Sequence, residues 1–351
     1  MIISNQDNSR DSGEEFLETN KSTKTKKTKA TEPSTIQKLE QEEDAIQLRP
    51  SRLDEVVGQT NVVRQLKLIL ESCQIRSAMP EHIMFYGQPG LGKTTLANLI
   101  ANEIGANFRV ITAPSLQKVG DIVGILVGLE PRTVLFIDEI HRLKAPLEET
   151  LYSAMEDHKV DIVMGKGHGA STLTMDVNPF VLVGATTQLG KLSKPLKDRF
   201  ATIFQLETYS DLDMHKLIER SCLIIGLNLT ENAISLVCDR ARGVPRIANN
   251  ILKRILDYQV VLGSNKLTID QVKNIFTDLG IHAQGLTRSD LTYLKALQGG
   301  STLGLRTLAS ILQEDIDTVE QVIEPYLLHL GLIDKTISGR SLTTKGKSLL
   351  L

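Results

Sequence analysis

The fold is decided by the stretch Phe85-Tyr86-Gly87-Gln88-Pro89-Gly90-Leu91-Gly92-Lys93-Thr94-Thr95. An apolar strand, 83–86, leads into a loop with the spacing G-x-x-x-x-G-K-T, and a helix follows from Thr94. Glycines let successive backbone N–H groups approach phosphate oxygens, and a helix N-terminus favours negative charge. We expect Lys93 to reach the β- and γ-phosphates of ATP and the Thr94 hydroxyl to bind Mg²⁺. The alternative, a glycine-rich surface turn, does not explain why the strand, loop and helix occur together.

A second apolar run, 134–137, ends in Asp138 and Glu139, which is the Walker B pattern. Strands expected at 83–86, 108–111, 134–137 and 181–187 alternate with helices expected at 61–73, 94–101 and 121–129, which predicts a parallel sheet covered by helices. Such a sheet delivers both acids to the edge where the phosphates lie. We expect Asp138 to hold Mg²⁺ and Glu139 to polarise the attacking water. The alternative is an acidic strand end that faces solvent.

Two further features lie at the edge of this domain. Alternating residues at 160–164 and 171–175 flank a glycine-rich loop and predict a β-hairpin. The strand 181–187 ends in hydroxyls, so Thr187 can bond near the γ-phosphate. Arg199 ends a short helix, where it is either a surface ion-pair partner or an arginine finger that completes a neighbouring subunit's site.

The remainder of the chain predicts two smaller domains. Residues 211–279 are helical in pattern, and Pro245 starts a helix with Arg246 just inside it, so Arg246 can turn back toward phosphates. Beyond residue 285, three helices and a pair of strands around a glycine turn predict a winged helix. From Lys335 onward the chain carries bases and no acid, which favours contact with DNA phosphates, although a protein-contact module remains open.

Composition limits the class of protein, its cellular compartment and the number of its domains. The chain has 351 residues and a net charge of −2, so any grip on nucleic acid must be local. It shows no membrane-spanning run and no signal peptide, and its three cysteines lack disulfide or metal spacing, so we expect a cytoplasmic protein. We expect a disordered polar tail at 1–46, a large ATPase domain at 47–209, a small helical domain at 210–281 and a winged-helix head at 282–351. The tail's lysines could touch nucleic acid, but the tail carries more acids than bases.

Taken in order, these motifs resemble the RuvB family, the AAA+ motors of Holliday junction branch migration. The likeness runs from about Leu48 to the end and is carried by the P-loop, Leu135-Phe136-Ile137-Asp138-Glu139-Ile140-His141-Arg142-Leu143, Tyr152-Ser153-Ala154-Met155-Glu156-Asp157, Gly184-Ala185-Thr186-Thr187, Asp198-Arg199-Phe200, Pro245-Arg246-Ile247-Ala248-Asn249 and Glu324-Pro325-Tyr326-Leu327. The resemblance implies an α/β P-loop AAA+ ATPase with a parallel sheet, a small helical lid and a C-terminal winged helix. It also implies an ATP hydrolase that serves recombination and DNA repair.

The resemblance assigns roles to individual residues. The implied nucleotide contacts are Leu48, Arg49, Gly90, Lys93, Thr94, Thr95, Glu156, Asp157, His158, Thr187, Arg199, Tyr209 and Arg246. Within this set, Thr187 would be the first sensor, Tyr209 the hinge, Arg246 the second sensor and Arg199 the finger. Glu139 and Arg199 would be catalytic, Thr94 and Asp138 would hold Mg²⁺, and Lys335 and Arg340 would contact DNA backbone.

The resemblance also implies partners. These are duplex DNA and Holliday junctions held through the backbone without sequence preference, a RuvA tetramer, a RuvC-type resolvase, and other copies of this chain in homohexameric rings, two per junction. Two departures weaken the expected grip: the wing has Ser338 and Lys335 where the family carries arginines, and the hairpin that docks RuvA reads Ala170-Ser171-Thr172 without its usual arginine. Gln88 replaces a more usual proline in a place where only backbone matters.

Two rival readings remain. A clamp-loader subunit would carry a Ser-Arg-Cys finger and often a four-cysteine zinc module, whereas this chain has Lys197-Asp198-Arg199 and no cysteine cluster. A nucleotide-gated binding protein that does not hydrolyse ATP would not need Lys93, Asp138, Glu139 and Arg199 together.

Overall fold

The structure is a computed structural model that describes residues 48–164, 171–300 and 302–350. The expected tail, 1–46, and the hairpin loop, 165–170, lie outside the described residues.

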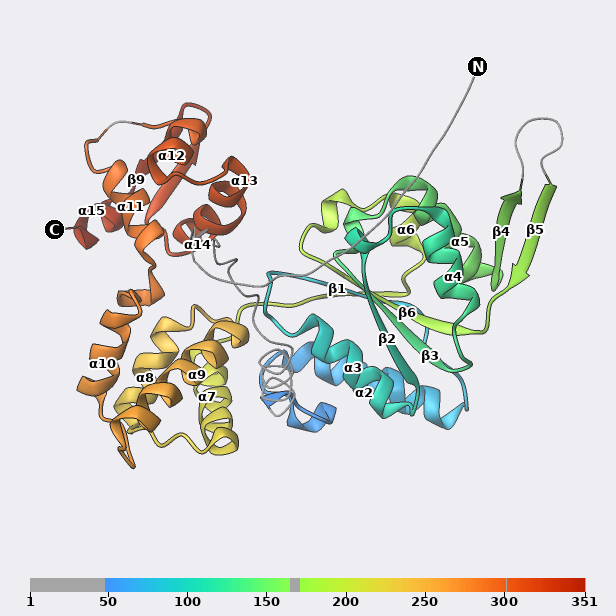
Figure 1. Ribbon diagram of the computed structural model, residues 1–351, viewed down its shortest axis with the longest axis horizontal. Helices are drawn as coiled ribbons and strands as arrows, with labels where there is room; N and C mark the ends of the chain where they lie inside the picture. Colours follow the sequence, from blue (N-terminus) through green and yellow to red (C-terminus); the bar gives the residue numbers. More distant parts are fainter. Residues whose placement is uncertain (1–47, 165–170, 301, 351) are drawn as a thin grey trace, which may run out of the picture. The chain divides into compact units, whose positions relative to one another are not determined.

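A sheet of five parallel strands carries the P-loop (Figure 1). Its order is β2-β3-β6-β1-β7, formed by β1 (Ile83–Tyr86), β2 (Asn107–Thr112), β3 (Thr133–Asp138), β6 (Phe180–Thr186) and β7 (Thr202–Gln205). The expected parallel sheet is confirmed. The edge strand β7 was not expected from the sequence, because a run of four residues with Gln205 at its end gives little periodicity.

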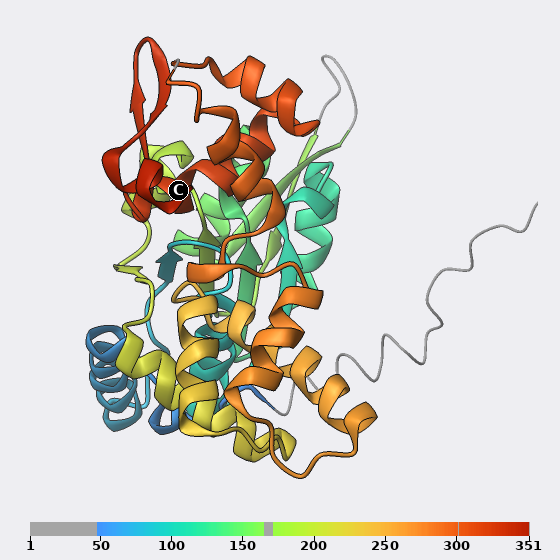
Figure 2. The ribbon, with the colours of Figure 1, turned by 90° about the vertical axis from the view of Figure 1, so that its left-hand side faces the viewer.

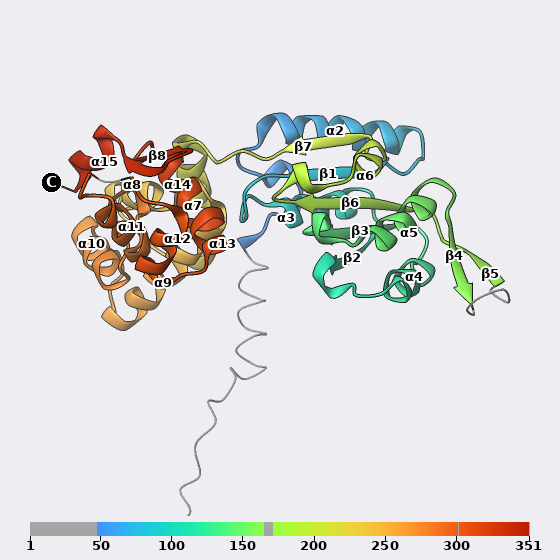
Figure 3. The ribbon, with the colours of Figure 1, turned by 90° about the horizontal axis from the view of Figure 1, so that it is seen from above.

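Helices cover both faces of the sheet (Figure 3). One face packs on α2 (Thr60–Ile75) and α3 (Lys93–Glu103), and the other on α4 (Val119–Val127) and α5 (Ala145–Glu156). Successive residues of a strand point to opposite faces. Phe136 therefore joins the first core while Leu135 and Ile137 join the second, which is why this strand is apolar throughout.

Two attachments extend this domain. The predicted hairpin is confirmed as the antiparallel pair β4 (Lys159–Met164) and β5 (Ser171–Asp176). A short helix, α6 (Lys194–Asp198), follows β6; the Ser193 side chain caps its start and Arg199 ends it.

A bundle of helices follows, drawn in yellow and orange in Figure 2. It consists of α7 (Asp211–Ile225), α8 (Glu231–Arg240), α9 (Pro245–Leu262) and α10 (Ile269–Asp278), around one apolar core. Side chains of Ser210 and Thr268 accept backbone N–H groups at the starts of α7 and α10, which satisfies donors that a helix end leaves free. The helical pattern expected for 211–279 is confirmed.

The C-terminal part is the expected winged helix. It comprises α11 (Arg288–Ala296), α12 (Leu305–Leu312), α13 (Ile316–Thr318) continuing through a π-helical turn (Val319–Ile323) into α14 (Glu324–His329), the hairpin β8 (Ile333–Thr336) and β9 (Gly339–Leu342), and α15 (Thr344–Leu349). A bridge between Leu303 and Arg340 ties the segment after α11 to the wing. The helix α15 was not expected from the sequence.

Two further features concern the length of the helices and the state of the cysteines. Among the described helices, none has the length and apolar character that crossing a membrane would require. Cys73 and Cys222 are buried and Cys238 is half-buried, all as free thiols, so they pack as small apolar side chains.

Candidate nucleotide-binding site

The P-loop wraps around the Lys93 side chain. Gly87 and Gly90 have φ values of +149° and +84°, and a Cβ at Gly87 would lie 2.5 Å from the Leu206 carbonyl oxygen, so only glycine fits there. Lys93 is 7% exposed, and its ammonium donates to the carbonyls of Gly87 at 2.8 Å and Gln88 at 2.9 Å. Burial lowers the pKa of Lys93, while Asp138 and Glu139 oppose that shift. This arrangement holds the ammonium beside the loop that would cradle phosphates.

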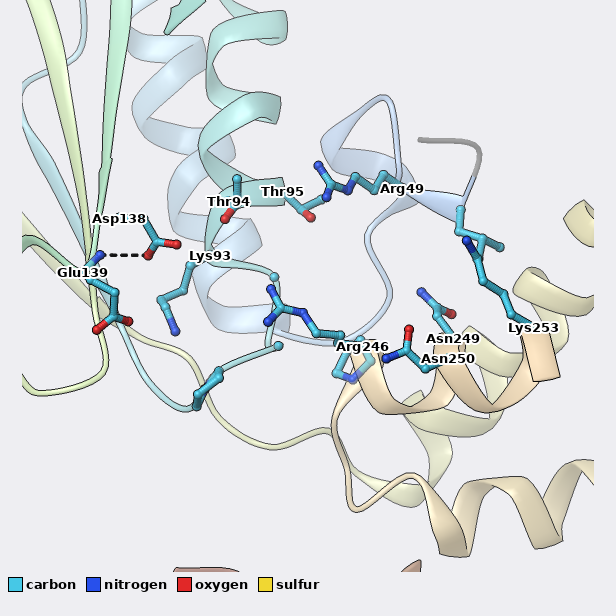
Figure 4. A pocket seen from close by; sticks show the side chains of 15 residues that line it. Arg49, Lys93, Thr94, Thr95, Asp138, Glu139, Arg246, Asn249, Asn250 and Lys253 are labelled. Carbon is cyan, nitrogen blue, oxygen red and sulfur yellow. Dashed lines mark hydrogen bonds between the residues drawn. The ribbon is translucent and has the colours of Figure 1, made fainter. Parts of the chain in front are cut away.

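A pocket of about 380 Å³ opens over this loop (Figure 4). Its lining joins four separate segments of the chain and consists of Leu48, Arg49, Pro89, Gly90, Gly92, Lys93, Thr94, Thr95, Asp138, Glu139, Pro245, Arg246, Asn249, Asn250 and Lys253. The structure therefore brings together nine of the predicted site residues: Leu48, Arg49, Gly90, Lys93, Thr94, Thr95, Asp138, Glu139 and Arg246.

The two acids at the end of β3 are held in different ways. The Asp138 carboxylate accepts the backbone N–H of Glu139 at 2.9 Å, which fixes one of its oxygens. Glu139 has a φ of 52°, a left-handed conformation that costs a residue with a Cβ and is often found at functional sites. The turn aims its carboxylate away from the strand and toward Thr187 and His141.

A small network grips the Glu139 carboxylate. The Thr187 hydroxyl donates to Oε2 at 3.4 Å, and Nε2 of His141 lies 3.4 Å from the same oxygen. The other ring nitrogen of His141 lies 2.9 Å from the Thr186 hydroxyl. Burial lowers the pKa of His141, and the nearby Glu139 carboxylate opposes that shift. Thr187 is thus placed next to a residue that lines the pocket.

Arg246 enters the site from the start of α9. Its backbone N–H donates to the Gly90 carbonyl at 3.4 Å, and Figure 4 shows its side chain extending toward the P-loop. A Cβ on Gly90 would lie 2.8 Å from Cγ1 of Val244 and 3.0 Å from Cβ of Arg246. The loop and the start of α9 are therefore in direct contact.

Three lining residues were missed by the sequence analysis: Asn249, Asn250 and Lys253. They follow Arg246 on α9 at spacings of three, four and seven residues, which place all of them on one face of that helix. That spacing was the signal that could have found them. Asn249 is anchored, because its side-chain oxygen accepts the Ser221 hydroxyl at 3.1 Å.

A smaller pocket of about 90 Å³ adjoins the first one. Its lining is mainly apolar and includes Leu48, Val56, Leu91, Leu217 and Tyr209, and it shares Arg49 and Asn249 with the first pocket. Tyr209 packs closely on Gly58, where a Cβ would lie 2.8 Å from the ring, and its backbone N–H donates to Gly243 at 2.9 Å. Burial raises the pKa of Tyr209 to about 12. Tyr209 therefore joins the segment that precedes α2 to the helical bundle.

The other predicted contacts form a separate group at the ends of α5 and α6. Arg199 pairs with Glu156 at 3.0 Å, so the surface ion pair expected as one alternative is present. Asp157 ends α5, and His158 follows with a φ of 53°. Within the described residues the lining of the larger pocket does not include these four, and this placement leaves the finger role of Arg199 a prediction.

The wing residues are paired with acids that precede them in the sequence. Lys335 lies 2.8 Å from Glu320 and 3.6 Å from Glu324, and Nε of Arg340 lies 2.7 Å from Glu324. Arg340 is 9% exposed and Glu324 1% exposed. The predicted excess of positive charge on the wing is thus partly neutralised by α14 and the turn before it, which the count from Lys335 onward could not show.

Comparison with known proteins agrees with this geometry. Residues 48–206 match the Holliday junction DNA helicase RuvB P-loop domain, 209–282 the RuvB AAA lid domain and 283–351 the RuvB C-terminal winged helix domain. The Holliday junction branch migration complex subunit RuvB of Campylobacter fetus subsp. fetus (strain 82-40) is 45% identical over 305 residues, 87% of this chain and 89% of the relative. The same subunit of Ehrlichia ruminantium (strain Gardel) is 44% identical over 311 residues, 88% of this chain and 94% of the relative.

A solved structure gives the same result. The Thermotoga maritima RuvB Holliday junction branch migration motor matches with a TM-score of 0.77 and 39% sequence identity, over 87% of this chain and 98% of that chain. These matches cover every motif on which the resemblance rested and disfavour the clamp-loader reading. The chain belongs to the RuvB family of nucleotide-binding P-loop AAA+ ATPases.

Proposed function

We propose that this chain is an ATP-dependent motor subunit that drives branch migration of Holliday junctions during homologous recombination and DNA repair. The observation that carries the proposal is the convergence of Lys93, Asp138 and Arg246 on one pocket. A phosphate-binding loop, an acidic strand end and an arginine of the following helical bundle then respond to the same nucleotide. The printed names of the relatives and of the solved structure supply the junction as substrate.

In the proposed reaction the P-loop N–H groups and Lys93 hold the phosphates of ATP. Glu139 orients and polarises the attacking water, and Thr187 and His141 hold its carboxylate in place. Attack at the γ-phosphorus breaks its bond to the β,γ-bridging oxygen and releases ADP and phosphate. Burial lowers the pKa of His141, which disfavours a charged imidazole beside this carboxylate.

Thr94 and Asp138 fit the binding of Mg²⁺. A hydroxyl and a carboxylate are oxygen ligands of the kind this ion prefers, and both residues line the pocket. One Asp138 oxygen accepts the Glu139 N–H, which orients the carboxylate. When bound, the ion would neutralise phosphate charge that Lys93 and Arg246 alone leave uncompensated.

Arg199 is proposed to act on the nucleotide of the next subunit in a homohexameric ring. Support comes from its separation from the pocket of its own chain and from the other predicted contacts beside it, Glu156, Asp157 and His158. An arginine finger supplies charge stabilisation worth about 10³ to 10⁵ in rate. In this arrangement each site needs two adjacent copies of the chain.

The nucleotide state is proposed to move the helical bundle and the head. Arg246 contacts the P-loop through Gly90, and Tyr209 packs against Gly58 at the entry to α7. Loss of the γ-phosphate removes a partner of Arg246, so the bundle can turn about Tyr209 and pull the attached winged helix with it.

The winged helix is proposed to grip the backbone of duplex DNA without reading bases. Lys335 is the better placed of the two predicted contacts, because its side chain is 41% exposed and its acidic partner Glu320 is also exposed. Arg340 was predicted to contact DNA as well; its pairing with the buried Glu324 supports an additional task in holding the wing.

The remaining partners are proposed as follows. The hairpin β4–β5 would dock a RuvA tetramer, and its exposed Leu173 suits a protein contact. Two rings would act on each junction beside a RuvC-type resolvase, in the cytoplasm.

We also propose the domain boundaries 47–209, 210–281 and 282–351. Separate apolar cores support this division: two cores lie on the faces of the sheet, one lies within the bundle and one within the winged helix. Val244 and Ile247 are exceptions, because they pack against the sheet's core from the start of α9.

Glu139→Gln tests the proposal directly. Purified Glu139→Gln protein should bind ATP and a synthetic four-way junction with the RuvA-type partner, but should neither hydrolyse ATP nor separate the junction's strands. Losing a general base costs about 10² to 10⁴ in rate. Strand separation at the wild-type rate in this variant would refute a motor driven by hydrolysis at this site.

A further inference from the structure

The Arg199 guanidinium is held by contacts with three residues of its own chain. Its guanidinium carbon is 4.4 Å from the centre of the Tyr152 ring, within the range of a cation–π contact. One guanidinium nitrogen donates to the Pro195 carbonyl at 2.9 Å, and another lies 3.0 Å from Glu156. The Arg199 side chain is 21% exposed, so one part of it stays open to a partner.

The Tyr152 ring is itself fixed from behind. Its hydroxyl bonds to Glu148 at 2.8 Å and lies 2.9 Å from the Ser193 hydroxyl, and Ser193 donates to the same Glu148 oxygen at 2.6 Å. Glu148 is 8% exposed, and a buried carboxylate needs such donors. Ser193 also caps α6, the helix that Arg199 ends. The network therefore ties α5 to both ends of α6.

We propose that Tyr152 is the positioning residue of Arg199: its ring is the platform that holds the guanidinium in the direction of the neighbouring subunit's nucleotide. This inference rests on the proposed finger role of Arg199. An arginine side chain loses about 2 kcal/mol of rotamer entropy when it is fixed. If the Tyr152 ring already restricts the Arg199 side chain in the free subunit, this entropy is not lost again when the neighbouring subunit's nucleotide binds.

The competing explanation is that Tyr152 only packs the core of its own domain. The ring does contact the apolar cluster on that face of the sheet. The two explanations differ in which active site they affect. A packing defect damages the pocket of the same chain, whereas a positioning defect damages the pocket of the next chain.

Subunit mixing separates the two explanations. Tyr152→Leu removes the platform, and Tyr152→Phe keeps the ring while losing its hydroxyl. Each variant is assayed for ATP hydrolysis alone and after mixing with Lys93→Ala subunits, which bring an intact Tyr152 and Arg199 but cannot use their own P-loop. Random mixing in equal amounts leaves about one interface in four fully intact. Leu151→Ala is the matched control, because Leu151 is fully buried in the apolar cluster against which Tyr152 packs.

Tyr152→Leu alone should lower kcat by about three- to thirtyfold, the range of a cation–π contact, with nucleotide affinity unchanged. Tyr152→Phe should keep most of the activity. Expressed per subunit that has an intact P-loop, hydrolysis by Tyr152→Leu should rise on mixing, whereas any loss caused by Leu151→Ala should remain.

Arg199→Ala, mixed in the same way, tests the underlying function. If Arg199→Ala is rescued and Tyr152→Leu is not, the platform is refuted and the shared site stands. If neither is rescued, the shared site itself fails.

Discussion

The hydroxyl of Thr187 donates to Oε2 of Glu139 across 3.4 Å, from the end of one parallel strand to the end of its neighbour. This contact links the residue expected to sense the γ-phosphate with the residue expected to activate water. A hydrogen bond to a charged group contributes about 1.5 to 3 kcal/mol, and this one is long and half-buried.

Thr187→Val should therefore lower kcat for ATP hydrolysis by about tenfold and leave nucleotide affinity nearly unchanged. Valine keeps the shape of threonine and removes only the donor. The matched control is Thr187→Ser, which keeps the hydroxyl and should retain most of the activity. Steady-state hydrolysis together with fluorescent-nucleotide binding measures both quantities, and equal kcat in Thr187→Val and wild type would show that the contact does not hold Glu139.

The proposed finger role of Arg199 leads to a prediction about mixed subunits. Arg199→Ala alone should lose at least about 10³ in hydrolysis rate, the lower end for an arginine finger. Lys93→Ala subunits should also be inactive alone. Mixing the two variants should restore activity at interfaces where Lys93 of one subunit meets Arg199 of the other. Two inactive variants that stay inactive when mixed would place Arg199 outside the neighbour's site.

Asn249 should contribute to nucleotide binding more than to chemistry. Its oxygen is taken by the Ser221 hydroxyl, so its amide N–H groups remain as donors beside both pockets. Asn249→Ala should weaken ATP and ADP binding by about tenfold, one ordinary hydrogen bond, with kcat at saturating ATP preserved. Ser221→Ala, which removes the anchor and keeps the amide, should give a smaller loss in the same direction. Unchanged dissociation constants for both nucleotides would remove Asn249 from the site.

In the winged helix, one substitution should change stability and another should change DNA binding. Glu324→Ala removes the carboxylate that pairs with the buried Arg340 and accepts the buried Tyr293 hydroxyl, so it should destabilise the winged helix by about 3 to 5 kcal/mol. Lys335→Ala removes the exposed pair with Glu320 and a longer contact of 3.6 Å to Glu324, which keeps Arg340 and Tyr293 as partners. It should therefore leave thermal stability within about 1 kcal/mol of wild type.

On duplex DNA, Lys335→Ala should weaken binding alike for all sequences and reduce the salt dependence by about one phosphate contact. Fluorescence anisotropy at several salt concentrations measures this slope. A slope equal to that of wild type would mean that Lys335 does not contact phosphate.

The sequence predicted most of the fold and the centre of the site because those features are local. The order of strand, glycine loop and helix around Lys93 lies within a few residues, and so does the apolar run that ends at Asp138 and Glu139. Apolar periodicity likewise predicted the helical bundle and the winged helix. The short edge strand β7 carries too few residues for any period to be visible.

Contacts between distant segments could not be predicted in the same way. Nothing local in the sequence indicates that Glu156 would meet Arg199, that Tyr152 would lie under the guanidinium, or that Glu324 would take up Arg340. The basic stretch from Lys335 onward predicted positive charge on the wing, because charge was counted along the chain. Pairing with acids depends instead on the packing of α14 against β8 and β9.

The most direct test of the motor is to follow ATP hydrolysis and strand separation of a synthetic four-way junction in one reaction, with and without the RuvA-type partner. We predict that duplex or junction stimulates hydrolysis, and that strand separation appears when the partner is added and stops in Glu139→Gln. A rate of ATP hydrolysis that is unchanged by DNA and by the partner, with the junction left intact, would contradict the account.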